Sequence, residues 1–313
     1  MKNLNIFITG GAGFIGTNLV LELQAKFSCN IVIVDNLSPT CGASPSNCAE
    51  VEKIATFIKG DIRNPGIIEE HLKSAHVVVN CAAESSHIGA FENPDQNFEV
   101  NAAAVLHMLQ FLKQHNRDCK FVQLGTTTQF GAQIEKVATE QHPEFPLDIY
   151  SAHKSLAENY CLIFAKKYGL RATVIRLSNV YGPRARNDTP SLTFNNFFIG
   201  QAIRGEELNI FDDGMQIRNP LFVDDAVNAI VECMIKHEPD GQTFIVCGNE
   251  SLSVREIAEE TVKIFNSGRI NFTKFPEDRK RIEIGNSDLS HEKFTSMTGW
   301  QPNIVLKEGL QRT

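Results

Sequence analysis

Apolar residues recur along the chain in two alternating patterns. Short runs rich in β-branched residues, typical of buried strands, are separated by longer stretches in which apolar positions follow a helical spacing. Strands are expected at Leu4–Thr9, Ile31–Asp35, Thr56–Lys59, His76–Asn80, Lys120–Leu124 and Thr173–Leu177, and helices at Gly13–Phe27, Ile67–Lys73, Asn93–His115 and Ile149–Tyr168. This repetition predicts βαβ crossovers and a parallel sheet.

The alternation loosens after Asn179. The stretch Tyr181–Pro190 is rich in Gly, Pro, Arg and Asn, which marks a loop that leaves the sheet. Leu221–Val223 and Thr243–Cys247 again read as short strands, so the chain is expected to revisit the sheet. The pattern therefore predicts one α/β domain over residues 1–178. Residues 179–313 are expected to form a smaller interleaved α/β portion, with short returns to the main sheet near 221–247.

Composition narrows the range of partners. A chain of 313 residues that is 42% hydrophobic can bury a substantial core. Its formal charge of -7 gives no general attraction for nucleic acid or an anionic membrane. The eight cysteines are scattered without a CxxC pair, which favours reduced thiols and no metal site. No apolar run resembles a signal peptide or spans a bilayer, so we expect a cytoplasmic protein.

A glycine-rich turn follows the first strand. Its sequence, Thr9-Gly10-Gly11-Ala12-Gly13-Phe14-Ile15-Gly16, stands between a predicted strand and a predicted helix. This spacing lets the backbone approach a pyrophosphate at a helix N-terminus, where unpaired N–H groups favour negative charge. The turn therefore predicts dinucleotide binding by a Rossmann-like, doubly wound parallel sheet.

Two aspartates follow the next strands. Asp35 closes the second strand, where its carboxylate can bind both adenosine ribose hydroxyls and repel a 2′-phosphate, which favours NAD over NADP. Asp61 follows the third strand, where it could meet the adenine amino group. Either residue could instead be an ordinary aspartate at the start of a loop.

Tyr150 and Lys154 stand four residues apart at the start of a predicted helix, and so lie on one face of it. An ammonium there can stabilise the phenolate, lower the pKa of Tyr150 and make it a general base near neutral pH. Thr126, at the end of the strand that precedes this helix, could hydrogen-bond the reacting oxygen. The alternatives are a surface helix pair and a loop-capping threonine.

Taken together, these residues resemble the extended short-chain dehydrogenases/reductases that act on nucleotide-diphosphate sugars. The matching segments, in chain order, are Thr9–Gly16, Asp35–Ser38, Gly60–Arg63, Ala82-Ala83, Tyr150–Lys154, Arg176 with Asn179–Pro183, Arg218 with Val223–Asp225, and Gly299–Pro302. The resemblance implies the Rossmann-like fold, NAD as cofactor, a nucleotide-diphosphate sugar as substrate and a homodimer.

The resemblance also implies roles for individual residues. The catalytic set would be Thr126, Tyr150 and Lys154. Cofactor contacts would come from Gly10, Gly13, Phe14, Ile15, Gly16, Asp35, Asn36, Asp61, Ile62, Ala82, Ala83, Asn101, Tyr150, Lys154 and Leu177. Substrate contacts would come from Glu84, Thr127, Thr128, Asn179, Asn196, Arg218, and Arg279 or Arg281, between which the sequence does not choose.

Departures from the family pattern bear on the reaction. Sugar 4,6-dehydratases carry Asp and Glu after the catalytic threonine, whereas this chain has Thr127 and Thr128. The missing carboxylates favour 4-epimerisation through a transient 4-keto sugar. A 4-dehydrogenase or 4-ketoreductase is the main alternative. Ala83-Glu84-Ser85 resembles the dehydratase version of its segment, which keeps a 4,6-dehydratase open, and a non-catalytic NAD sensor is a remote alternative.

The predicted dimer would pack two helices per subunit, near Asn93–His115 and Ile149–Tyr168. Its apolar candidates are Val105, Met108, Leu109 and Leu112, or Leu156, Ile163 and Phe164. The same positions could instead face the sheet, because periodicity alone does not separate the two.

Overall fold

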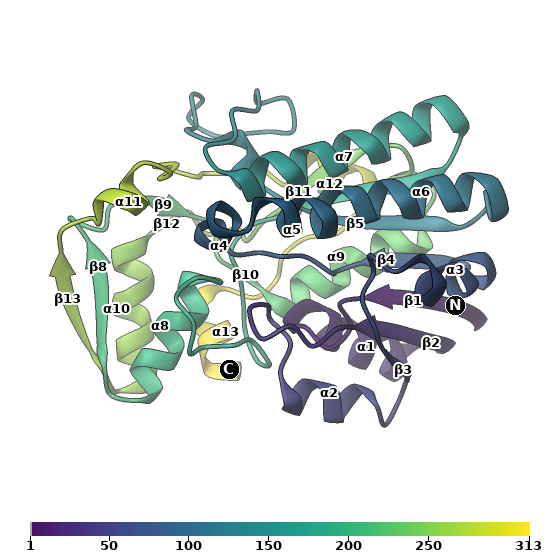
Figure 1. Ribbon diagram of the computed structural model, residues 1–313. Helices are drawn as coiled ribbons and strands as arrows, with labels where there is room; N and C mark the ends of the chain where they lie inside the picture. The colour runs from purple at the N-terminus through teal and green to yellow at the C-terminus, as the bar shows by residue number, and fades with distance from the viewer. Residues whose placement is uncertain (1) are drawn as a thin grey trace.

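A seven-stranded parallel sheet forms the centre of the protein in a computed structural model that describes residues 2–313 (Figure 1). Its strand order is β11-β6-β5-β4-β1-β2-β3, and every neighbouring pair is parallel. The strands are β1 (Lys2–Thr9), β2 (Ser28–Asp35), β3 (Thr56–Lys59), β4 (Val77–Asn80), β5 (Lys120–Thr126), β6 (Arg171–Leu177) and β11 (Thr243–Val246). The predicted α/β fold with a doubly wound parallel sheet is thereby confirmed.

Helices cover both faces of this sheet (Figure 1). One face carries α1 (Phe14–Lys26) and α9 (Val223–Ile235), with α2 (Pro45–Val51) against α1. The other carries α3 (Pro65–Ser74), α6 (Ala104–His115) and α7 (Ile149–Tyr168). Strand residues of opposite parity enter the two cores, with Ile6 and Ile8 on the first face and Phe7 on the second.

The apolar residues considered for a dimer mostly belong to this second core. Val105, Met108, Leu109, Leu112 and Phe164 are buried against the sheet. Ile163 differs, because 54% of it is exposed on the outer side of α7.

The long helix expected over Asn93–His115 is interrupted. It consists of α5 (Pro94–Phe98), one π-helical turn η1 (Glu99–Ala103) and α6. A π turn inserts one extra residue and shifts the following side chains around the helix. The turn contains Asn101, whose amide donates to the Glu84 carbonyl at 2.9 Å.

A smaller lobe follows β6 and lies at one end of the sheet (Figure 1). Its core lies between α8 (Phe194–Ile203), α10 (Val254–Phe265) and the parallel pair β8 (Glu207–Phe211) and β13 (Arg269–Thr273). Shorter elements complete it: β7 (Val180–Tyr181), β9 (Ile217–Arg218), β10 (Leu221–Phe222), β12 (Leu252–Ser253), α11 (Glu277–Lys280), α12 (Glu292–Thr298) and α13 (Leu306–Arg312). No helix within residues 2–313 has the length and apolar character needed to span a membrane.

The chain returns to the main sheet once after β6. Thr243–Val246 pairs with β6 as the edge strand β11. The prediction that Leu221–Val223 returns to the main sheet is wrong, because Leu221–Phe222 pairs with Val180–Tyr181 in a separate two-stranded sheet. Both edges of β6 are taken by β5 and β11, so β10 cannot pair with β6. The division at residue 178 stays a proposal.

Candidate active site

A cavity of about 1130 Å³ opens between the carboxyl ends of the parallel strands and the smaller lobe. It lies beside the point where the strand order reverses, between β1 and β4, which is where ligands bind in open parallel sheets. Most of the predicted site residues line it: Gly10, Gly13, Phe14, Ile15, Gly16, Ala83, Thr126, Thr127, Thr128, Tyr150, Lys154, Leu177, Asn179, Asn196, Arg218 and Arg279.

The glycine turn brings backbone close to backbone. Gly10 has φ +67, and a Cβ placed on it would lie 2.7 Å from the Ala82 nitrogen. A Cβ on Gly16 would overlap the Gly10 carbonyl, so α1 can begin directly against the turn. Its N-cap, Gly13, offers no capping side chain. The first N–H groups of α1 therefore face the cavity without a side-chain acceptor, an arrangement that suits a pyrophosphate.

Asp35 is buried at the end of β2 and does not line the cavity wall. Its carboxylate accepts from the backbone N–H of Ala12 at 3.0 Å and of Leu37 at 2.8 Å. Burial raises the pKa of Asp35, and these two hydrogen bonds oppose that rise. The carboxylate is thereby held beside the glycine turn, and its predicted contact with the adenosine ribose stays a prediction.

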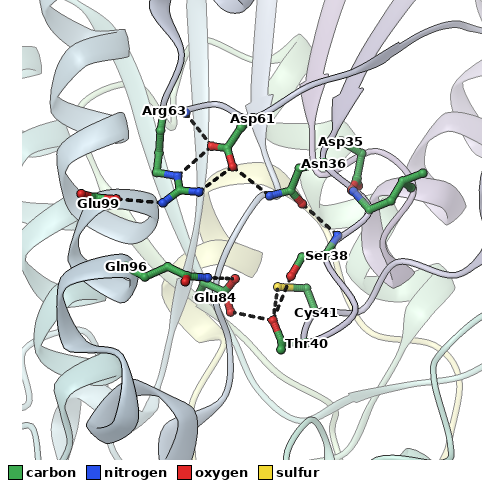
Figure 2. A network of polar contacts seen from close by, with 11 residues as sticks. Asp35, Asn36, Ser38, Thr40, Cys41, Asp61, Arg63, Glu84, Gln96 and Glu99 are labelled. Carbon is green, nitrogen blue, oxygen red and sulfur yellow. Dashed lines mark hydrogen bonds and ion pairs between the residues drawn. The ribbon is translucent and has the colours of Figure 1, made fainter.

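A polar network joins the ends of β2 and β3 (Figure 2). Asp61 accepts from the Asn36 amide at 3.0 Å and from the Arg63 guanidinium at 2.9 Å on each of two nitrogens. The Arg63 hydrogen bond is the main reason that the pKa of Asp61 falls to about 2. Arg63 also donates to Glu99 at 2.8 Å. The structure thus brings Asn36 and Asp61 together outside the cavity lining, and Ile62 is buried beside them.

Three further predicted residues stand behind the cavity wall rather than in it. The Glu84 carboxylate accepts from Thr40 at 3.3 Å and from Gln96 at 3.0 Å (Figure 2). Asn101 brackets the Glu84 backbone, accepting from its N–H at 3.2 Å as well as donating to its carbonyl. Ala82 is in close contact with Gly10. Asn101 and Ala82 therefore shape the segment that carries Ala83 into the cavity.

The three predicted catalytic residues meet at the cavity. Burial raises the pKa of Tyr150, the Asp148 carboxylate adds to this, and a hydrogen bond with Thr126 opposes it. The Lys154 ammonium donates to the Leu124 carbonyl at 2.5 Å, and burial lowers its pKa to about 8. Because burial raises the pKa of Tyr150 in the protein alone, the expectation that Lys154 makes it a base near neutral pH stays a prediction for the protein with NAD bound.

A chain of hydrogen bonds that the sequence did not predict leads away from Thr126. The Thr126 hydroxyl lies 2.9 Å from that of Thr128, which lies 2.7 Å from that of Ser151. Ser151 donates to Asp148 at 2.8 Å, and Asp148 is 2.9 Å from His87 Nδ1. His87 and Asp148 both line the cavity. The two residues are 61 positions apart in the sequence, and no motif links them. Asp148 alone could have been recognised, as the N-cap of α7.

The lobe contributes the predicted substrate residues. Arg218 donates to the Gly285 carbonyl at 2.5 Å and to Glu283 at 3.0 Å, yet still lines the cavity. Arg279 lines the cavity with its guanidinium over the Phe211 ring, whereas Arg281 is exposed outside the lining. The Asn196 amide is taken up by backbone groups of Val180 and Gly182. Of the two alternative arginines, only Arg279 therefore faces the cavity.

Metal-binding side chains do not gather here. Within the described part of the chain, no group of three or more His, Cys, Asp or Glu side chains is arranged to hold a metal ion.

The chain is similar to known proteins over nearly its whole length. Residues 6–247 match the model of the NAD dependent epimerase/dehydratase family. A putative UDP-glucose 4-epimerase of Methanocaldococcus jannaschii is 28% identical over 98% of this chain and 96% of its own length. The dTDP-glucose 4,6-dehydratase of Xanthomonas campestris pv. campestris is 29% identical over 98% of this chain and 91% of its own.

Solved structures agree in fold. UDP-glucose 4-epimerase from Thermotoga maritima with UDP-glucose has a TM-score of 0.89 at 27% identity, covering 99% of this chain and 97% of that one. The dTDP-glucose 4,6-dehydratase of Bacillus anthracis in complex with NAD has a TM-score of 0.86 at 25% identity, covering 99% and 95%. Together with the glycine turn, the Asp35 site and the Tyr150–Lys154 helix, these matches assign the chain to the NAD dependent epimerase/dehydratase family, with NAD as its cofactor.

Proposed function

We propose that the protein catalyses 4-epimerisation of a nucleotide-diphosphate sugar through a transient 4-keto intermediate. The observation that most supports this proposal is that Thr126, Tyr150 and Lys154 line one cavity together with the glycine turn. Positions 127 and 128, where carboxylates would serve water elimination, carry threonine hydroxyls instead. The similar epimerases of M. jannaschii and T. maritima support this reading, the latter with UDP-glucose in its structure.

Tyr150 acts as the general base and acid in this proposal. NAD, when bound, supplies the chemistry of taking a hydride from the sugar and giving it back. Tyr150 removes the proton of the 4-hydroxyl and returns it after the sugar has turned over in the cavity. Thr126 hydrogen-bonds the same oxygen. The Lys154 ammonium, held at the Leu124 carbonyl in the same cavity wall, would stabilise the phenolate. The cycle needs no external reductant.

Arg218 and Arg279 would hold the substrate diphosphate. Both arise from the smaller lobe and line the same cavity as the glycine turn. A guanidinium suits phosphate because its N–H groups form a planar fork. Arg218 keeps contacts with Gly285 and Glu283, which fix its direction before substrate binds. Asn179, Asn196, Thr127 and Thr128 would complete the walls around the sugar.

Contacts between the smaller lobe and the segments around the cofactor site support an epimerase over a dehydrogenase. Arg186, from the loop after β7, donates to the carbonyls of Pro39 at 2.7 Å and Cys41 at 3.2 Å, in the loop after β2. Arg184 pairs with Glu50 of α2 at 2.8 Å. These contacts tie the lobe to segments around the cofactor site. An enzyme that takes back its own hydride benefits from such closure, whereas one that exchanges NADH must open it.

The alternatives keep specific support. A 4-dehydrogenase or 4-ketoreductase uses the same three catalytic residues and stops at the keto sugar. A 4,6-dehydratase is favoured by the similar X. campestris and B. anthracis enzymes and by Ala83-Glu84-Ser85. The buried Tyr150 and Lys154 in a large cavity argue against a protein that only senses NAD.

The test is to incubate the purified holoenzyme with UDP-, GDP-, CDP- and dTDP-hexoses in deuterium oxide without added cofactor. We expect an inverted 4-position by NMR with loss of neither water nor carbon. Tyr150→Phe should lower turnover by about 10²–10⁴-fold while NAD stays bound. Tyr168→Phe, in the half-exposed last residue of the same helix, is the matched control. Loss of water would favour the dehydratase, and product limited to one per bound NAD would favour the dehydrogenase.

A further inference from the structure

A histidine and a buried carboxylate form a pair in the cavity wall beside Tyr150. His87 opens α4 (His87–Glu92), and Asp148 is the N-cap of α7. His87 Nδ1 lies 2.9 Å from an Asp148 oxygen. The Asp148 side chain is 2% exposed and the His87 side chain is 32% exposed, so the carboxylate is enclosed while the imidazole reaches the cavity.

The contacts of Asp148 fix the orientation of the imidazole. Besides His87, the carboxylate accepts from the Ser151 N–H and from the Ser151 hydroxyl, each at 2.8 Å. Burial disfavours its ionised form, but the hydrogen bonds from His87 and Ser151 outweigh burial and lower its pKa. An ionised acceptor selects the tautomer with the proton on Nδ1 and leaves the Nε2 lone pair available. In residues 2–313, no hydrogen bond engages His87 Nε2.

Helix capping alone does not account for the pair. Asp148 would cap α7 through Ser151 without any histidine. His87 adds a titratable group whose ring meets the Tyr150 ring edge to face, with 4.9 Å between centroids. The same carboxylate leads through Ser151 and Thr128 to Thr126. His87 therefore stands next to the position where Tyr150 and Thr126 would hold the sugar 4-oxygen.

We propose that His87, oriented by Asp148, is a second acid–base group of this site, acting on a carbon next to the 4-keto group. Neutral Nε2 takes the proton from that carbon, and the C–H electron pair moves to form the enolate of the ketone. Tyr150 and Thr126 stabilise the enolate oxygen by hydrogen bonds. The imidazolium then returns a proton to the carbon, so the step is redox-neutral and needs no further reactant.

This inference rests on the proposed function, because the ketone is the intermediate that function generates. Its consequence is a wider chemistry than hydride transfer at carbon 4, since the neighbouring carbon can exchange its hydrogen or change configuration. It also supplies acid–base capacity in a site where Thr127 and Thr128 have none. The reactive substrate class is a nucleotide-linked 4-keto hexose.

The test supplies the ketone directly. NAD-loaded enzyme is incubated in deuterium oxide with dTDP- and UDP-linked 4-keto-6-deoxyglucose, and deuterium at carbons 3 and 5 is followed by proton NMR. Wild type should exchange one of them well above the rate without enzyme. His87→Gln should lower this enzymatic rate by about 10²–10⁴-fold. Asp148→Asn should lower it as well, because the wrong tautomer is then favoured.

His153→Gln is the matched control. His153 also lies on α7, but its Nδ1 is 2.8 Å from Asn97 and it lies outside the cavity lining. The His153→Gln variant should exchange deuterium at the wild-type rate. The NAD content and melting temperature of each variant verify that the fold is intact. Wild type without exchange above the buffer rate, or His87→Gln with wild-type exchange, overturns the inference.

The proposed function is tested separately, with nucleotide-linked hexoses that have not been oxidised, by NADH absorbance or by inversion of carbon 4. Enzyme that inverts carbon 4 but does not exchange keeps the proposed function and loses this inference. Enzyme that exchanges deuterium but does not oxidise a hexose keeps this inference and loses the proposed function.

Discussion

Burial controls the charge of the central lysine. Lys154 is buried in the cavity wall, and the loss of hydration lowers its pKa to about 8. Its ammonium is therefore present below that pH and disappears above it. In the proposed function the charged form stabilises the Tyr150 phenolate, so we expect the catalytic site to become less active as the solution turns alkaline.

We expect kcat/KM for the sugar to fall above pH 8, because this ratio reports groups that titrate before substrate binds. The pH profile of wild type is compared with that of Lys154→Arg, whose guanidinium keeps its proton throughout the range. The falling limb should persist in Lys166→Met, which changes an exposed lysine of the same helix. If kcat/KM falls above pH 8 in Lys154→Arg as it does in wild type, the fall belongs to another titrating group.

The site residues differ in how far the sequence reveals them. Tyr150 and Lys154 follow from helical spacing after a strand, and the glycine turn follows from its place between strand and helix. Arg279 and Arg281 are equivalent in sequence, and only the position of the short α11 brings Arg279 to the cavity. His87 and Asp148 depend on two segments packing together, which no local pattern encodes.

The junction between β1 and α1 has little steric tolerance. Gly16→Ala would place a methyl group against the backbone of Gly10 and Gly11. We expect it to strip NAD from the purified protein and to lower stability by about 1–3 kcal/mol, as overpacking does. Bound NAD after gel filtration and thermal unfolding are measured.

Gly169→Ala is the matched control for this substitution. Gly169 ends α7 with φ +73, and nothing lies within 4 Å of an added Cβ. The left-handed backbone alone should cost about 1–2 kcal/mol, with NAD retained. Equal NAD loss in both variants would mean that general destabilisation, rather than the turn, releases the cofactor.

Strands and helices of the first half follow closely from periodicity, because each is long and buried on a definite face. The π turn at Glu99–Ala103 escapes such reasoning, since the five residues of α5 before it are too few to show a change in the phase of the apolar pattern. Most of the smaller lobe escapes it too, because pairs such as β9 and β12 contain two residues each. α10 could have been predicted from the capping box of Ser253 and Glu256 and the amphipathic run after it.

At the level of the whole protein, the two lobes are joined across the cofactor site by Arg186. Arg186→Ala removes its hydrogen bonds to Pro39 and Cys41. Charged hydrogen bonds are worth about 1.5–3 kcal/mol, so NAD should dissociate about 10–150-fold faster. Stopped-flow displacement measures the rate. Arg204→Ala removes an exposed ion pair with Glu206 and should leave the dissociation rate of NAD unchanged. An equal effect in this variant would refute the role of Arg186 in holding the two lobes together.

We propose that the protein forms a homodimer through the outer side of α6 and α7, which lie side by side (Figure 1). Phe98 and Ile163 are 41% and 54% exposed near this surface. Ile163→Glu should yield monomers by light scattering after gel filtration, because a buried unpaired carboxylate opposes association. Ile203→Glu, at an equally exposed position on α8, should leave the dimer intact. A wild-type monomer would refute the proposal.

The order of strands in the sheet also governs how the protein can be made. β11 covers the outer edge of β6, yet it is translated about 70 residues later, roughly 4–14 s at typical rates of synthesis. Until then a nascent chain that has folded its first half presents the bare edge of β6, which can pair with other chains. The emerging polypeptide is therefore most exposed to aggregation while the ribosome translates the smaller lobe, and this is the interval in which a chaperone would protect it.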